Sequence, residues 1–201
     1  NDSRSIIQAK YTLSFQFPKL AFLLPENSAF VGNWQLVDIG LHPTYIQETD
    51  SNHFYITHVD AVSMLKHRNR FAHKGTFGHA AILAGSKGKV GAALLASKAC
   101  LRSGVGLLSI QSPAVAYSIL QSQVPEAMVL ADMHEDYIAE LKPEIFNYTL
   151  AIGPGIGMAE PTQLLLKRII QETNQPLVLD ADALNILAEN KTWLSFLPQG
   201  T

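Results

Sequence analysis

The sequence predicts an α/β protein with a doubly wound, mainly parallel sheet that carries helices on both faces. From about residue 79 onward, short apolar runs such as "AAILAG" alternate with helical patterns such as "GAALLASKACLRSG". Continuous apolar strands are typical of parallel sheets with both faces buried, and helices between them supply the crossovers. A short β-rich segment precedes this region, because its apolar residues are mostly β-branched or aromatic.

Four strands and four helices are expected in the α/β region, in strict alternation. The expected strands are "AAILAG", "GLLSIQ", "YTLAIGPG" and "PLVLDAD". The expected helices are "GAALLASKACLRSG", "PAVAYSILQSQ", "PTQLLLKRIIQET" and "ALNILAEN". Each apolar run is short enough for a strand, and each helical pattern has apolar residues at a helical period.

The start of the chain lacks this alternation of strands and helices. It contains two strand-like runs with no helix of convincing period between them. These runs are "YTLSFQF" and "WQLVDIG", with prolines and a glycine as breaks. The polar stretch that follows is interpreted as a linker with a short helix near "VDAVSMLKHR". We place the domain boundary so that residues 1–48 form the β-rich segment and linker, and residues 49–201 form the α/β domain.

The composition is that of a globular protein and leaves small neutral or moderately anionic ligands open. The 201 residues are 47% hydrophobic, and 15 Lys and Arg against 17 Asp and Glu leave a net charge of −2. With no basic run, neither nucleic acid nor a membrane surface is an expected partner. The single cysteine, Cys100, and the lack of a secretory leader or membrane span favour a cytoplasmic protein. A homo-oligomer is expected.

Three loops rich in glycine or short acids follow the expected strands, and we predict that they form a binding site. They are "AGSKGKVGA", "GPGIG" and "DADALN". In doubly wound sheets, ligands bind beyond the carboxyl ends of the strands, where these loops must lie.

The first loop spaces its glycines as Gly85, Gly88 and Gly91, which matches neither the P-loop nor the dinucleotide fingerprint. These glycines could simply turn the chain from strand to helix. Alternatively, Gly91 and Ala92 begin a helix of small residues whose N–H groups face an anion such as a pyrophosphate.

In the second loop, Gly153, Gly155 and Gly157 leave the strand exit almost without side chains. An ordinary loop rarely needs this, so we expect a flat aromatic ring or a ribose to lie against this backbone.

The third loop and a preceding motif supply polar candidates. Asp182 is expected to cap the next helix, whereas Asp180 and Asn185 are candidate ligand contacts. Two acids without a third ligand define no metal site, so none is predicted. In "HKGTFGHA", Lys74 is a candidate phosphate contact for a nucleotide cofactor, with a solvated surface lysine as the commoner alternative.

Four motifs occur in the order and spacing of one known family. They are "HKGTFGHAAILAGSKGKVGAALLASKACLRSGVGLLSI", "VPEAM", "AIGPGIG" and "VLDADALN". From His73 to the end, the chain resembles the ATP- or ADP-dependent NAD(P)H-hydrate dehydratase family, a branch of the ribokinase-like fold. The stretch "YTLSFQFPKLAFLLP" followed by "GNWQLVDIGL" is similar to the last strands of an NAD(P)H-hydrate epimerase domain, which precedes the dehydratase in many bacterial proteins.

The resemblance implies repair of a damaged cofactor. The hydroxyl on the hydrated nicotinamide ring of the S-epimer of NAD(P)H-hydrate is phosphorylated from ATP or ADP, and loss of phosphate restores NAD(P)H. Mg²⁺ is expected with the nucleotide. In the family, positions that match Ala92 and Gly155 contact the hydrated cofactor.

The resemblance also implies that the catalytic machinery is incomplete in these residues. The family's Pro-His-Pro-x-Glu and Gly-x-Gly-Asp motifs do not occur here, so the catalytic aspartate is expected beyond Thr201. We therefore expect an incomplete ribokinase-like sheet, in a fragment that spans the junction of a bifunctional enzyme and lacks turnover alone. Two alternatives remain: a ribokinase-like kinase of a vitamin precursor, and a non-catalytic nucleotide-binding module.

Overall fold

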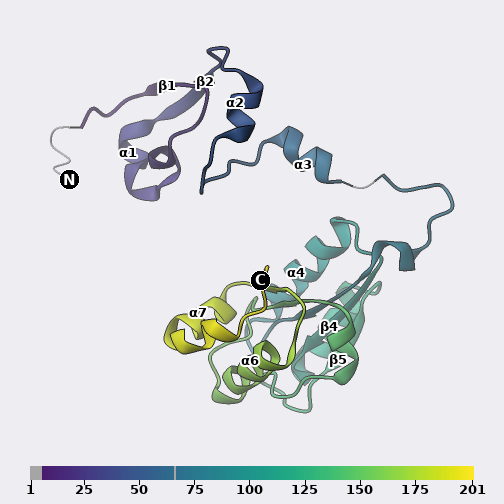
Figure 1. Ribbon diagram of the computed structural model, residues 1–201. Helices are drawn as coiled ribbons and strands as arrows, with labels where there is room; N and C mark the ends of the chain where they lie inside the picture. The colour runs from purple at the N-terminus through teal and green to yellow at the C-terminus, as the bar shows by residue number, and fades with distance from the viewer. Residues whose placement is uncertain (1–5, 66) are drawn as a thin grey trace. The chain divides into compact units, whose positions relative to one another are not determined.

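The computed structural model describes residues 6–65 and 67–201, and it divides into two compact units at His67 and Arg68 (Figure 1). The structure therefore places the division later than the expected boundary after residue 48. One reason is aromatic packing: the ring of Tyr55 lies edge-on to that of Trp34, with 6.2 Å between centroids. This contact holds part of the expected linker in the first unit.

The first unit is built around a two-stranded parallel sheet. Strand β1 (Tyr11–Phe15) pairs with β2 (Asn33–Val37). The connection contains helical turns that the sequence pattern did not predict, and two further helices follow the sheet. These elements are η2 (Leu20–Leu23), η3 (Pro25–Asn27), α1 (Ser28–Val31), α2 (Pro43–Glu48) and α3 (His58–Met64). The expected short helix near "VDAVSMLKHR" is confirmed as α3, which begins with a capping box between Thr57 and Asp60.

The second unit contains a five-stranded, all-parallel sheet in the order β5-β4-β3-β6-β7. Its strands are β3 (His79–Leu83), β4 (Leu107–Ser112), β5 (Met128–Ala131), β6 (Thr149–Ile152) and β7 (Leu177–Leu179). From β3 the chain builds outward to β4 and β5, and then returns to add β6 and β7 on the other side. This order is the doubly wound topology that the sequence predicts.

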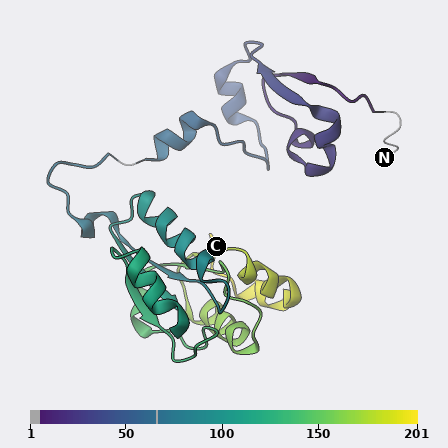
Figure 2. The same cartoon turned by 180° about the vertical axis from the view of Figure 1, so that it is seen from behind.

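Helices cover both faces of this sheet (Figures 1 and 2). The α-helices are α4 (Val90–Arg102), α5 (Tyr117–Gln123), α6 (Glu160–Glu172) and α7 (Asp182–Glu189). The 3-10 helices are η4 (Lys74–Phe77), η5 (Ala114–Ala116), η6 (Pro143–Asn147) and η7 (Lys191–Phe196). Successive side chains of β3 alternate between faces: Leu83 packs in the cluster that includes α6 and α7, and Ile82 in the cluster that includes α4 and α5.

The predicted strands and helices of this unit are confirmed to within a few residues, but one strand and the 3-10 helices η4, η6 and η7 were not predicted. Strand β5 was not predicted, because its four residues are too few to show a period and they follow directly on the turn-like "VPEA". None of the described helices reaches the length and apolar character that a bilayer span requires.

His79 begins β3 as a partly buried histidine. Its ring stacks on Tyr148 with 3.5 Å between centroids, and its Nε2 lies 2.9 Å from the hydroxyl oxygen of Ser109. Burial lowers the pKa of His79 below its ordinary value of 6.5. The folded state therefore prefers the neutral ring.

We expect His79 to make the second unit less stable in mild acid. When the folded pKa lies below the unfolded value, the unfolded state binds more protons, so stability is full above the unfolded pKa of about 6.5 and falls as the pH drops below it. A His79→Phe variant keeps a ring against Tyr148 but cannot titrate. Unfolding free energies measured at about pH 7.5 and about pH 5.5 should therefore differ less in the variant than in the parent protein. Parallel profiles for the two proteins would contradict this assignment.

Candidate functional site

The candidate site lies where the chain changes direction in the sheet, between β3 and β6. These strands are neighbours with opposite outward windings, so the switch point of the sheet lies between them, and ligands of doubly wound sheets bind at the carboxyl edge of such a point. Two hydrogen bonds join the loops: the N–H of Gly85 donates to the carbonyl of Pro154 at 2.8 Å, and the hydroxyl of Ser86 donates to that of Gly155 at 2.8 Å. The predicted meeting of these loops is confirmed.

Two glycines of the second loop cannot be replaced without moving the backbone. A Cβ on Gly153, whose φ is +137°, would overlap the carbonyl oxygen of Asp180. A Cβ on Gly155, whose φ is +66°, would lie 2.9 Å from the Cβ of Ala92. Real Cβ atoms do not approach so closely, so the glycines allow the three loops to touch. Ala92 and Gly155, the two positions matched to the family's substrate contacts, are direct neighbours.

Asp182 ties the third loop to the other two. Its Oδ2 accepts a hydrogen bond from the N–H of Gly157 at 2.8 Å and pairs with Nζ of Lys89 at 3.1 Å. Its Oδ1 accepts from the side-chain amide of Asn185 at 3.3 Å. Partial burial raises the pKa of Asp182, but these bonds and the charge of Lys89 outweigh it, so the pKa lies below its usual value. The carboxylate is charged and structural.

The expectation that Asp182 caps a helix is wrong. Helix α7 begins at Asp182, the preceding Ala181 occupies the cap position, and no side chain caps this end. Ala181 has a φ of +47°, an unusual value for a residue with a Cβ. The chain therefore turns more sharply than the spacing suggests, and this turn points the carboxylate of Asp182 toward the other loops.

A fourth loop, which follows β5, borders the site and was missed from the sequence. Asp132 is buried at the end of β5, with 3% of its surface exposed, and accepts backbone hydrogen bonds from His134, Ala139 and Glu140. Farther along this loop, Asp136 pairs with Nζ of Lys87 at 2.9 Å. Three acids in "DMHED" were the available signal, but nothing local shows that they reach the glycine loop.

The remaining predicted residues lie at different places. Gly91 is exposed in the first turn of α4, and nothing outside its own helix lies within 4 Å of an added Cβ. Asp180 is exposed at the end of β7. Lys74 lies at the opposite, amino edge of the sheet, because a Cβ on Gly106, just before β4, would overlap the carbonyl oxygen of Lys74. This chain does not bring Lys74 to the glycine loops.

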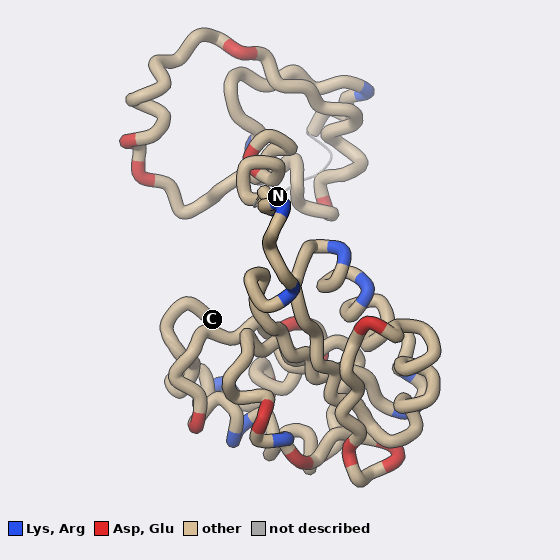
Figure 3. Tube along the Cα trace, turned by 90° about the vertical axis from the view of Figure 1, so that its right-hand side faces the viewer, with Lys and Arg blue, Asp and Glu red and all other residues tan. Residues whose placement is uncertain are grey.

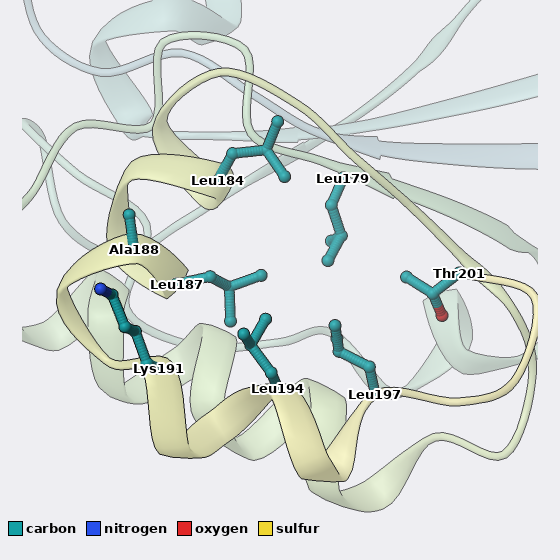
Figure 4. Close-up of a pocket in the computed structure, with 8 residues that line it drawn as sticks. All are labelled: Leu179, Leu184, Leu187, Ala188, Lys191, Leu194, Leu197 and Thr201. Carbon is teal, nitrogen blue, oxygen red and sulfur yellow. The ribbon is translucent and has the colours of Figure 1, made fainter. Parts of the chain in front are cut away.

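The described residues offer few places for a metal or an apolar ligand. Over residues 6–65 and 67–201, no group of three or more His, Cys, Asp or Glu side chains could hold a metal ion. Leucines of β7, α7 and η7 line a pocket of about 450 Å³ (Figure 4). Its lining is apolar apart from Lys191 and Thr201, and it includes none of the loop glycines.

Comparison with known proteins identifies the fold and the family. Residues 80–200 match a family model described as NAD(P)H-hydrate dehydratase. The chain belongs to the NAD(P)H-hydrate dehydratase family. All three site loops of this family member lie inside the matched region, and Lys74 lies outside it.

A ribokinase-like superfamily protein from Enterococcus faecalis shares the fold, with a TM-score of 0.59 at 23% identity over 71% of this chain and 52% of its own. An ADP/ATP-dependent NAD(P)H-hydrate dehydratase from Bacillus subtilis, co-crystallized with ATP and Mg²⁺, is 31% identical with a TM-score of 0.51. That similarity covers 64% of this chain and 46% of the Bacillus chain. The ribokinase-like fold expected from the sequence is confirmed.

A bifunctional NAD(P)H-hydrate repair enzyme from Moorella thermoacetica is 31% identical over 190 residues. This match covers 90% of the present chain, so it extends well before the family model begins. It covers only 36% of the Moorella enzyme. The chain therefore spans little more than a third of that relative.

Proposed function

We propose that this chain is part of a bifunctional nicotinamide nucleotide repair enzyme, and that its second unit belongs to the dehydratase that converts the S-epimer of NAD(P)H-hydrate to NAD(P)H with ATP or ADP. One observation carries the proposal. In a member of the dehydratase family, the loops after β3 and β6 meet at the switch point, and Ala92 lies against Gly155. Family membership also favours dehydration over the vitamin-precursor kinase and the non-catalytic module.

The residues of this chain can bind and orient the dinucleotide. Gly153 and Gly155 let the loops after β3, β6 and β7 pack closely against one another, and Gly155 is partly exposed beside Ala92. Ser86 and Asp182 hold the loops in place through the hydrogen bonds described above, which orders the surface before the ligand arrives. ATP or ADP with Mg²⁺ would supply the phosphoryl group. The described residues contain no cluster for that metal, and we derive no catalytic step through it.

We further infer that residues 1–48 are the tail of an epimerase-like domain. Tyr11, Leu13 and Phe15 all point to one face of β1 and are 62%, 66% and 63% exposed. A strand with such an apolar face is usually covered by other elements of its own domain. The length of the match with the bifunctional Moorella enzyme also supports this assignment. A cytoplasmic location and a homo-oligomeric state remain predictions.

The 22.0 kDa chain should bind the substrate but should not catalyse the reaction. Because the catalytic aspartate is expected beyond Thr201, the chain should bind NAD(P)H-hydrate, measured by calorimetry, without restoring the reduced-nicotinamide absorbance when Mg²⁺ and ATP or ADP are added. Intact mass would verify the chain used. Failure to bind would contradict the proposed function. Regenerated NADH would show instead that the placement of the aspartate is wrong.

A further inference from the structure

The glycine loop carries two lysines, and each is held by an aspartate from a different loop. Lys87 pairs with Asp136 from the loop after β5, at 2.9 Å, and Lys89 pairs with Asp182 from the loop after β7, at 3.1 Å. Lys87 and Lys89 are the only basic residues in the three loops, residues 84–91, 153–159 and 180–185. Elsewhere in the second unit, basic and acidic residues are interspersed along the trace (Figure 3). Lys87 and Lys89 are therefore the basic side chains that these three loops offer to an anion.

Of the two lysines, Lys89 is the one that lies beside the second loop. Its Cβ lies 3.1 Å from the point where a Cβ on Gly155 would stand, so its stem packs against Gly155 in the second loop. Lys87 instead faces the loop after β5, to which its backbone N–H is also bonded, at 2.9 Å from the carbonyl of Asp136. A ligand that lies against Gly155 is thus within reach of Lys89.

The pair between Lys89 and Asp182 can open without leaving the carboxylate of Asp182 without hydrogen bonds. The side chain of Lys89 is 53% exposed, so solvent weakens its attraction to Asp182. Asp182 is only 16% exposed, but it keeps two other hydrogen bonds, from the N–H of Gly157 and the side-chain amide of Asn185. Lys89 is therefore the member of the pair that is free to move.

The charge of the site also requires a cation when an anion binds. Asp180 and Asp182 lie in the same loop, and the carboxylate of Asp180 is exposed. A dinucleotide brings at least two negative charges on its pyrophosphate. Without a neighbouring cation, these carboxylates would repel it.

We propose that Lys89 binds a phosphate group of the dinucleotide substrate by exchanging Asp182 for that phosphate. This inference rests on the proposed function and deepens it, since it names the residue that recognises the anionic part of the substrate. In the free protein, Asp182 neutralises Lys89. In the complex, the phosphate takes the place of Asp182, which remains bonded to Gly157 and Asn185.

Three variants test this exchange, with NADPH as the probe and calorimetry as the measurement. Lys89→Met keeps the apolar stem but lacks the charge, and should weaken NADPH binding about ten- to a hundredfold, as expected for a lost charge-assisted hydrogen bond. Lys87→Met is the matched control from the same loop and should change binding less than about twofold. Added salt should weaken binding less steeply in Lys89→Met than in the parent protein.

Asp182→Asn separates binding from a purely structural role. The asparagine can still accept the N–H of Gly157, but it no longer competes for Lys89. Asp182→Asn should bind NADPH as tightly as the parent protein or more tightly, even though it and Lys89→Met break the same ion pair. If both variants weaken binding alike, or if Lys89→Met binds like the parent protein, the exchange is wrong while the proposed function stands. If the parent protein binds no NADPH, the proposed function itself fails.

Discussion

A Gly153→Ala variant should lose about 2 to 6 kcal/mol of unfolding free energy in the second unit, the sum of about 1–3 kcal/mol for backbone strain and about 1–3 kcal/mol for overpacking. Gly153 follows β6 with a φ of +137°, and an added Cβ would overlap the carbonyl oxygen of Asp180. The N–H of Asp180 donates to the carbonyl of Ile152 at 3.0 Å, so relief of the overlap must pull β7 away from β6. Hydrogen exchange of peptides covering both strands measures the effect within this unit alone.

Gly88→Ala is the matched control for this prediction. Gly88 also has a positive φ, +81°, but nothing lies within 4 Å of an added Cβ. Its substitution should therefore cost only the strain of the left-handed conformation, about 1–2 kcal/mol. Equal losses in the two variants would mean that the contact between Gly153 and Asp180 does not hold the strands together. NADPH binding should fall only in Gly153→Ala, because its second loop must move.

Much of the fold follows from local patterns in the sequence. The apolar run that begins at Ala80 was expected to form a strand, and β3 runs from His79 to Leu83. Helix α6 was expected from residue 161 and begins at Glu160. These elements are predictable because their apolar period and their glycine or proline boundaries lie within a few residues of one another.

Less of the organisation of the first unit could be predicted from the sequence. The two strands were predicted, but the helical turns between them were not, because η2, η3 and α1 have only three or four residues each. Such turns are too short to show a helical period. The first compact unit extends to His67 and includes the contact between Trp34 and Tyr55, which local composition does not reveal.

The meeting of the three loops was predictable, whereas the bonds between them were not. The rule that ligands bind at the carboxyl edge brought the three loops together correctly. The bonds that hold them join residues far apart in the chain: Ser86 and Gly155 are 69 residues apart, and Lys89 and Asp182 are 93 apart. No spacing rule connects residues so distant. The same limit explains why Asp182 was assigned to a local helix cap.

An Asp132→Ala variant should release the loop after β5 and cost about 3 kcal/mol or more, because hydrogen bonds to a charged group contribute about 1.5–3 kcal/mol each. The buried carboxylate accepts the backbone N–H groups of His134, Ala139 and Glu140 at 3.0, 2.9 and 3.1 Å. Alanine leaves all three donors without this acceptor. Hydrogen exchange over residues 133–140 should accelerate strongly. It should also accelerate at the amide of Lys87, which donates to the carbonyl of Asp136 in the same loop.

Asp132→Asn distinguishes the charge from the shape of this side chain. In Asp132 one carboxylate oxygen bonds to His134 and the other to both Ala139 and Glu140. Asparagine keeps a single acceptor oxygen and turns its amide group toward at least one backbone donor. Its loss of stability and its exchange rates should lie between those of the parent protein and Asp132→Ala. Unchanged exchange at Lys87 in both variants would show that the glycine loop holds its position without the loop after β5, and that Asp132 supports only its own loop.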